Sequence, residues 1–295
     1  MDLAPIRILR NRRGRLTLVC TDVDGSEIVA TGSVTAAVVD SAGTALAGSP
    51  YTASLRSGTT GTYDITIPAA SLGTLDLLDV TWTFRPSGAT SDETQRQQAR
   101  VVGSYLFTIP EMRSFDAVLT EANQSDAKVW GIRDIVEEAF EKACRVAFTP
   151  QGYRATLDGN GKVSILVPHT ETRVLVSGSI DGIAMAAADI TDVAVYAWGV
   201  FQRKERGSWT AGERNVVLLY EHGYVTPPPE VSRAGMQLAR HLLRSGPLEN
   251  ERATAVFTDV GGMRLSLAGR DGPTGLPEVD AVLARWSRAQ AGAFA

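Results

Sequence analysis

The sequence has very few of the side chains that hold metal ions or cross-link small secreted domains. Of its 295 residues, only two are cysteine and three are histidine. Cys20 and Cys144 lie far apart in the chain, which excludes a disulfide scaffold and a cysteine-based zinc cluster. His169, His222 and His241 have no metal-ligand spacing. The sequence therefore predicts no bound metal and no other cofactor.

Long apolar runs and a surplus of positive charge are also missing. No run approaches the roughly 18 apolar residues of a transmembrane helix, and the apolar stretch at residues 16–20 is too short for a signal peptide. The chain carries 29 basic and 33 acidic residues, for a net charge of −4. Such a chain has no overall positive field. We therefore expect no membrane partner and no capture of nucleic acid by a single chain.

Residues 16–110 consist of short strand-like runs separated by turn residues such as Asp24-Gly25. The runs cover residues 16–20, 33–39, 51–55, 62–67, 80–84 and 99–109. Strands of this length, spaced at roughly 8–12 residues with Gly, Ser and Asp between them, are typical of an antiparallel sandwich. We predict an immunoglobulin-like β-sandwich over residues 16–110, without the disulfide of that fold.

The segment before the sandwich, residues 1–15, is rich in arginine. Its arginines are Arg7, Arg10, Arg12, Arg13 and Arg15. A cluster of like charges at a chain end is either a solvated, disordered arm or an arm that docks on a partner or on DNA. The sequence predicts a basic arm and leaves both interpretations open.

After Pro110 helical periodicity joins the strand signals, which predicts an α+β region over residues 111–268. The clearest helix is expected over residues 125–148, where Val129, Val136 and Phe140 belong to an apolar stripe and Glu137 lies on the charged side. Other helices are expected over residues 111–120, 230–244 and 277–286, with hairpins around residues 158–161 and 260–262. The polar stretch at residues 87–98 and Pro110 predict a domain boundary near residue 110.

One motif is similar to the catalytic motif of an enzyme family. Residues 16–26 resemble the nucleophile strand of haloacid-dehalogenase-type phosphatases, with Asp22 and Asp24 in place of the two catalytic aspartates. That chemistry needs a doubly wound α/β sheet, whereas here no helix is predicted for some 80 residues, so a β-turn at Asp24-Gly25 is favoured. His241 lies beside Leu238 and Leu242 and is expected to be a partly buried structural histidine. We predict that the chain is not an enzyme.

The helix predicted over residues 230–244 carries a polar stripe. Its members are Arg233, Gln237, Arg240 and Arg244. These positions are spaced by four, three and four residues, which places them on one helix face. The stripe is either a solvated face or a surface that lies against nucleic acid or against an acidic neighbouring subunit.

The end of the chain, residues 269–295, begins with glycine and proline and continues with a short apolar stripe. The stripe consists of Leu276, Val279, Val282, Leu283 and Trp286. A helix this short is marginal alone in water, so the stripe must be buried against its own domain or against another protein. A Gly/Pro tether would hold an intramolecular helix poorly, which favours a flexible docking tail.

Several motifs follow one another from residue 125 to the end of the chain. They are the helix that ends at Ala147-Phe148-Thr149-Pro150, the turn Asp158-Gly159-Asn160-Gly161, Ile180-Asp181-Gly182, Tyr220-Glu221-His222-Gly223-Tyr224, the helix that begins at Pro229, and residues 274–286. In this order they resemble the head-to-tail connector, or adaptor, proteins of long-tailed bacteriophages, particularly those of actinobacterial phages. The N-terminal sandwich is an addition to the minimal connector.

The resemblance implies an architectural function. Such connectors are virion proteins of the head–tail neck that are assembled in the host cytoplasm. They form a ring, usually of twelve copies, between the portal and the stopper or tail-completion proteins, and they extend the DNA channel. In this chain the resemblance implies that the stripe at 233, 237, 240 and 244 lines the channel, and that the stripe at 276–286 docks on the portal or on a neighbouring copy.

A second function remains open at this point. The sandwich is an alternative binding module for sugars or surfaces, with the second half of the chain as an oligomerisation module. Trp82, Tyr51 and Tyr63 are the aromatic side chains that would stack on a sugar, and their other interpretation is that they form the core of the sandwich.

Overall fold

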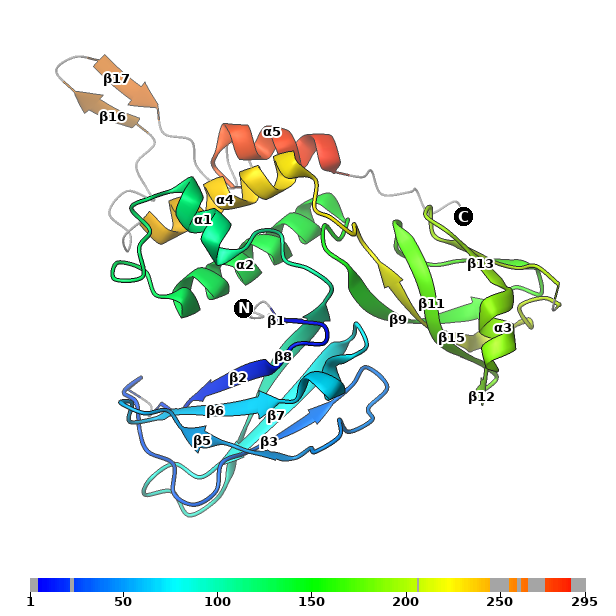
Figure 1. The fold of residues 1–295 in the computed structure, drawn as a ribbon, viewed down its shortest axis with the longest axis horizontal. Helices are drawn as coiled ribbons and strands as arrows, with labels where there is room; N and C mark the ends of the chain where they lie inside the picture. Colours follow the sequence, from blue (N-terminus) through cyan, green and yellow to red (C-terminus); the bar gives the residue numbers. More distant parts are fainter. Residues whose placement is uncertain are drawn as a thin grey trace. The chain divides into compact units, whose positions relative to one another are not determined.

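The computed structural model describes residues 5–21, 24–205, 207–244, 255–258, 261–264 and 274–287 (Figure 1). It is an α+β structure, as the sequence predicts. The chain divides into two compact units, Met1–Ser104 with Pro150–Gly223, and Tyr105–Thr149 with Tyr224–Ala295. This division differs from a single boundary near residue 110, because the strands after residue 150 group with the sandwich. No helix within the described ranges is long and apolar enough to span a membrane.

The first half of the β-rich unit is a two-layered sandwich. Its strands are β1 Ile6–Leu9, β2 Gly14–Val19, β3 Thr35–Val39, β4 Tyr51–Thr52, β5 Ser54–Leu55, β6 Thr62–Ile67, β7 Leu77–Phe84 and β8 Glu93–Val102, with a short 3-10 helix at Ala69–Leu72. One layer is the antiparallel sheet β2-β6-β5, and the other contains β4-β3-β7-β8, with β1 parallel to β8 (Figure 1). The sandwich is therefore confirmed, while its immunoglobulin-like character stays a prediction.

Alternation of apolar and polar residues explains the two layers. Along β7, Leu78, Val80 and Trp82 are buried while the residues between them are more exposed. Tyr63, Ile65 and Ile67 alternate in the same way along β6. Because successive strand residues point to opposite faces, each strand gives one apolar face to the space between the sheets. These faces form the sandwich core, in which Trp82 is completely buried.

Two predictions about this half are wrong. The arginine-rich segment is not a free arm from Ile6 onward, because β1 pairs with β8 and buries Ile8 in the sandwich core. The polar stretch at residues 87–98 does not separate two domains, since residues 93–98 form the first part of β8. In both segments the backbone pairing of a sheet orders residues whose polar side chains suggest disorder.

A second β-layer follows within the same unit. Its elements are β9 Gln151–Gly159, β10 Ser164–Leu166, β11 Thr172–Ile180, β12 Ile183–Ala184, α3 Ala187–Asp192, β13 Val193–Tyr196, β14 Val200–Arg203 and β15 Gly212–His222. The order β12-β11-β15-β9 continues the sandwich sheet through one residue pair, Val102 with Gln151, and β10-β14-β13 forms a separate sheet. Trp209, Phe201 and Tyr220 are buried in a core of this layer's own.

The other unit is helical. Its helices are α1 Ile109–Phe115, α2 Asp126–Cys144, α4 Pro229–Arg244 and α5 Pro277–Trp286, and a hairpin is formed by β16 Ala255–Thr258 and β17 Gly261–Arg264. Thr108 and Glu111 form a reciprocal capping box at the start of α1, and the Ser125 side chain accepts the Lys128 N–H at the start of α2. The helices predicted in the sequence are confirmed, with ends that differ by a few residues.

The helical core combines segments that are far apart in the chain. Its buried residues come from α1, α2, α4 and α5, and the second β-layer lies between α2 and α4 in the sequence. The predicted apolar stripe of α2 is buried, but Glu137 is buried as well and is only 2% exposed. Its Oε1 accepts the Leu106 N–H at 2.8 Å, which compensates part of the cost of burying the carboxylate. The prediction that Glu137 faces solvent is wrong.

Candidate functional site

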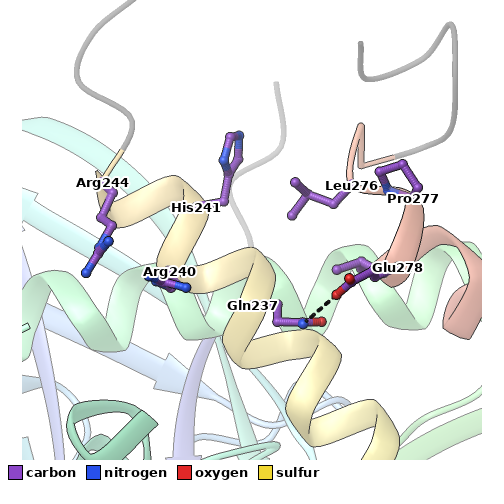
Figure 2. Close-up of a pocket in the computed structure, with 8 residues that line it drawn as sticks. Gln237, Arg240, His241, Arg244, Leu276, Pro277 and Glu278 are labelled. Carbon is purple, nitrogen blue, oxygen red and sulfur yellow. Dashed lines mark hydrogen bonds between the residues drawn. The ribbon is translucent and has the colours of Figure 1, made fainter. Parts of the chain in front are cut away.

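The polar stripe predicted on the helix after Pro227 lies on α4. Arg233, Arg240 and Arg244 are exposed, and Gln237 is half-buried. Gln237 donates a hydrogen bond from Nε2 to Glu278 Oε2, at 3.0 Å, at the start of α5 (Figure 2). The stripe is therefore solvent-facing along most of its length, and part of it is bound to neighbouring side chains.

Asp116, at the C-terminal cap of α1, joins two of the arginines. Arg240 Nε donates to its carboxylate at 2.9 Å, and Arg244 Nη2 lies 2.6 Å from it. Burial alone raises the pKa of Asp116, but the Val118 N–H and the guanidinium groups of Arg244 and Arg240 lower that pKa overall. The side chain of Asp116 is only 6% exposed, whereas Arg240 and Arg244 are 46% and 40% exposed.

This arrangement fixes the two guanidinium groups without covering them. Each arginine has five N–H donors in a rigid fork, and a single carboxylate below them uses only some of these donors. The outer edges of both groups thus remain available to an anionic partner. Asp116 was not identified from the sequence, because an isolated aspartate at a helix end carries no pattern that points to a partner more than a hundred residues away.

A groove of about 670 Å³ lies beside these arginines, between α4 and the start of α5 (Figure 2). Its lining residues are Gln237, Arg240, His241, Arg244, Leu276, Pro277, Glu278 and Val279. One wall is basic and the other is largely apolar, which suits a partner that presents both an acidic and an apolar side chain. His241 is exposed at this groove, so the prediction that it is partly buried is wrong.

The predicted docking stripe at the end of the chain packs on its own unit. Val279 and Leu283 are 1% and 3% exposed, and Leu276, Val282 and Trp286 pack against the same helical core. The indole of Trp286 lies edge-on to Phe148 and donates to Glu230 Oε1 at 2.7 Å. The prediction of a docking tail is therefore wrong for residues 274–287, because the core of the unit offers the burial that the stripe needs.

A local contact explains how the Gly/Pro segment holds this helix. Thr274 donates from both its backbone N–H and its hydroxyl to Asp280 Oδ1, at 3.0 and 2.7 Å. These two bonds fix the chain immediately before α5 and reduce the freedom that glycine and proline suggest. The rest of the predicted tail, residues 269–273 and 288–295, lies outside the described residues.

The arginines near the N-terminus are divided among several surroundings. Arg7 is buried in β1, and Arg10 forms an ion pair with Glu221 at 2.6 Å. Arg15 forms an ion pair with Asp64, which Arg56 also contacts. Arg12, Arg13 and Arg15 are exposed. The structure therefore does not bring these arginines together into one basic surface.

The structure brings together an aromatic and histidine cluster that the sequence did not reveal. The rings of His169 and His222 stack with centroids 4.1 Å apart, and Tyr153 lies 4.3 Å from His169. His169 Nδ1 shares a hydrogen bond of 2.8 Å with the Tyr220 hydroxyl. The register of β15 with β9 pairs Tyr220 with Tyr153, a long-range relation that no local motif encodes.

Burial sets the protonation state of this cluster. It lowers the pKa of His169 to about 4, with a further contribution from the charge of Arg100. The pKa of His222 is lowered even more, mainly by burial and further by the charges of His169 and Arg100. Burial raises the pKa of Tyr220. Both histidines are therefore neutral near pH 7.

The other candidate chemistries are not supported by the geometry. Strand β2, which precedes the Asp22/Asp24 motif, lies in an antiparallel sheet and not in a doubly wound parallel one, while Asp22 itself is outside the described residues. Within the described ranges, no three His, Cys, Asp or Glu side chains form a group that could hold a metal ion. Trp82 and Tyr63 are buried in the sandwich core, so they cannot stack on a sugar.

No protein-family model matches the sequence, and no curated protein matches it. Among solved structures, the chain is similar to a chain of a structure titled "Neck of empty GTA particle computed with C6 symmetry" and to one titled "Virion of native gene transfer agent (GTA) particle". In both comparisons the identity is 14%, the TM-score is 0.42, and the match covers 63% of this chain and 93% of the other. A TM-score of 0.42 does not establish a common fold, so the function has to be argued from the residues of this chain.

Proposed function

We propose that this chain is a structural protein of the neck of a bacteriophage-like particle. In this proposal it forms a ring of identical copies between the portal and the stopper or tail-completion proteins, and the ring extends the channel through which DNA passes. The protein has no catalytic role there. Its place is the assembled virion, and its partners are other virion proteins, further copies of itself and the packaged DNA.

The observation that supports the proposal is the common core of the connector-like motifs. One packed helical unit contains four of these segments. They are α2, the Ala147-Phe148 pair that follows it, α4 and α5. These segments are separated in the sequence by the second β-layer. The helical members of this motif order thus form one physical unit, whereas the turn at residues 158–161, the turn at 180–182 and residues 220–223 lie in the β-rich unit.

The charge of the chain fits a ring better than a monomeric DNA-binding protein. The chain as a whole is acidic, with a net charge of −4, so its arginines attract DNA only where many copies place them on one surface. We propose that Arg233 lines the channel, together with those guanidinium edges of Arg240 and Arg244 that no neighbouring copy covers. Asp116 neutralises part of this charge, which favours weak, sequence-independent contacts that let DNA slide.

Contacts with the portal and the stopper need surfaces other than the apolar stripe of the last helix, since that stripe is packed in its own unit. Exposed large apolar side chains among the described residues of the helical unit are Val118, Trp130, Ile135, Val225 and Leu242. Exposed tryptophan is a common anchor in protein interfaces. We propose that Trp130, on α2, belongs to the surface that contacts another neck protein.

Negative-stain electron microscopy tests this function. The purified chain is imaged alone and after mixing with DNA-filled heads that carry a portal but lack this protein. The expected result is ring-shaped particles, or added density at the portal vertex of the heads. Heads without a portal are the control and should remain undecorated. The absence of rings together with the absence of density at the portal vertex would contradict the proposal.

A further inference from the structure

The turn between β11 and β12 forms a rigid, solvent-facing tip. Asp181 and Gly182 both have positive φ, 51° and 77°, as in the two-residue turns that match the twist of a hairpin. The Asp181 N–H donates to the Asn215 carbonyl at 2.8 Å, and Asn215 Nδ2 donates to Asp181 Oδ1 at 3.1 Å. These bonds fix the orientation of the carboxylate before any partner binds, which lowers the entropic cost of binding.

The next residue makes this tip chemically unusual. Ile183 is 75% exposed, more than any other exposed large apolar side chain within the described ranges. Asp158 and Glu213 lie at the same end of the sheet as Asp181, and Lys162 and Arg214 lie there as well. The tip therefore combines a surplus of negative charge with an apolar side chain that water surrounds.

The groove between α4 and α5 has the complementary chemistry. Its basic wall is formed by Arg240 and Arg244, whose guanidinium groups stand between the buried Asp116 and solvent. Its other wall includes the apolar side chains of Leu276 and Pro277, and the carboxylate of Glu278 on this wall accepts a hydrogen bond from Gln237. Grooves of roughly 300–1,000 Å³ commonly hold ligands of a few dozen atoms, so 670 Å³ is sufficient for a two-residue turn and the following side chain.

We propose that the β11–β12 tip of one copy inserts into the α4–α5 groove of the neighbouring copy. The Asp181 carboxylate then pairs with the guanidinium edge of Arg240 or Arg244, and Ile183 packs on the apolar wall. The contact joins two different surfaces of the same chain, and such a head-to-tail contact gives a ring when the rotation between copies closes. This inference rests on the proposed ring and identifies the residues that hold neighbouring copies together.

Cysteine cross-linking tests the contact directly in the full-length chain. The variant Ile183→Cys/His241→Cys places one thiol on the tip and one at the groove, at two exposed positions. The native Cys20 and Cys144 are buried, and burial raises the pKa of each thiol to about 11, so they react slowly with a bismaleimide. The expected product is a ladder of covalent dimers, trimers and higher oligomers.

The control variants separate this contact from other associations. Either single cysteine variant should give no ladder, because a head-to-tail contact never brings two equivalent positions together. Trp198→Cys/His241→Cys is the matched control, since Trp198 is also strongly exposed, at 65%, but lies on the β13–β14 turn. Adding Asp181→Asn, or raising salt to about 1 M, where the Debye length is about 3 Å, should lower the ladder yield roughly fivefold or more.

The remaining outcomes overturn the inference and distinguish it from the proposed function. Rings seen by microscopy without a ladder in the double variant would contradict the contact and leave the neck function standing. A dimer from the Ile183→Cys variant alone would indicate a symmetric contact instead, and a cross-link within one chain would show that the tip fills its own groove. A ladder of equal yield from the Trp198 control would show non-specific association. Loss of both rings and ladder would contradict both proposals.

Discussion

The sandwich and the helical core differ in how far apart in the sequence their buried residues lie. The sandwich uses one continuous segment, from β1 to β8, in which alternating residues show directly which face of each strand is buried. The helical core uses two segments that the second β-layer separates, and its last helix comes from the end of the chain. Alternation along a strand predicts a buried face and, when strands follow one another closely, also what covers it. An apolar stripe on a helix predicts only that something covers it.

The largest effect is expected from damage to the sandwich. Trp82→Ala removes a completely buried indole and should lower the free energy of unfolding by about 4 kcal/mol, because a cavity remains in a well-packed core. Hydrogen exchange should show lost protection in β6 and β7 and unchanged protection in α2 and α4. Trp198→Ala is the control and should change little. Equal loss of protection in both cores would show that they unfold as one unit.

A slightly smaller loss of stability is expected from a substitution that tests whether the last helix belongs to the helical core. Leu283 is 3% exposed, and Leu283→Ala should lower the free energy of unfolding by about 3 kcal/mol, with exchange increasing in α2 and α4. Leu242→Ala, at a side chain that is 37% exposed, is the matched control and should cost much less. The measurement is urea denaturation followed by region-resolved exchange. An unchanged stability would restore the docking-tail interpretation.

Acid should weaken the β-rich unit through its histidine cluster. Burial depresses the pKa of His169 to about 4, so between about pH 6.5 and pH 4 the unfolded chain binds protons that the folded chain does not. The free energy of unfolding therefore has its full value above about pH 6.5. As the pH falls below this value, it decreases by roughly 1 kcal/mol per pH unit for each histidine. Denaturation curves across this range test the slope.

Variants test whether the histidine cluster causes this pH dependence of the free energy of unfolding. His222→Gln should make the pH dependence of the free energy of unfolding shallower, since it removes one of the two depressed groups. His241→Gln, which changes an exposed histidine of the helical unit, is the control. A slope that is the same in both variants and in the unaltered chain would show that other groups determine the acid sensitivity.

The smallest effect is expected from the carboxylate between α1 and α4. Asp116→Asn removes the charge that both Arg240 and Arg244 contact and should lower the melting temperature of the helical unit by a few degrees. Lys142→Gln removes the exposed partner, at 68%, of a pair with Glu138 and should have a smaller effect, because an ion pair with a solvated partner contributes little. Thermal melting followed by circular dichroism is the measurement. Equal shifts would indicate that Asp116 does not hold the two helices together.

Local patterns predicted most of the elements. Periodicity, capping residues and turn residues predicted the helix after Ser125, the helix near Pro229 and most strands of the sandwich. These signals are properties of residues that are neighbours in the sequence. The errors lie where distant residues decide. Glu137 is buried because a backbone N–H from another segment binds it, and residues 6–9 are ordered because β8 pairs with them.

The candidate site was predicted only in part. The stripe at 233, 237, 240 and 244 was found because four positions on one helix face form a pattern. Its partner Asp116 and the groove with Leu276 were not, since neither is near the stripe in the sequence. The His169–His222 stack was missed for the same reason, because it depends on how two strands are brought together within one layer.

The sequence by itself determined the α+β class, the positions of the main helices and strands, and the scarcity of metal-binding side chains. It determined these because composition, apolar spacing and capping act over a few residues. The tertiary structure alone decided that α5 is buried in the helical core, that residues 6–9 complete the sandwich, and that Arg240 and Arg244 stand over one buried carboxylate. The physical reason is that an apolar or charged side chain specifies the kind of partner it needs, whereas the folded chain determines which partner is near enough to supply it.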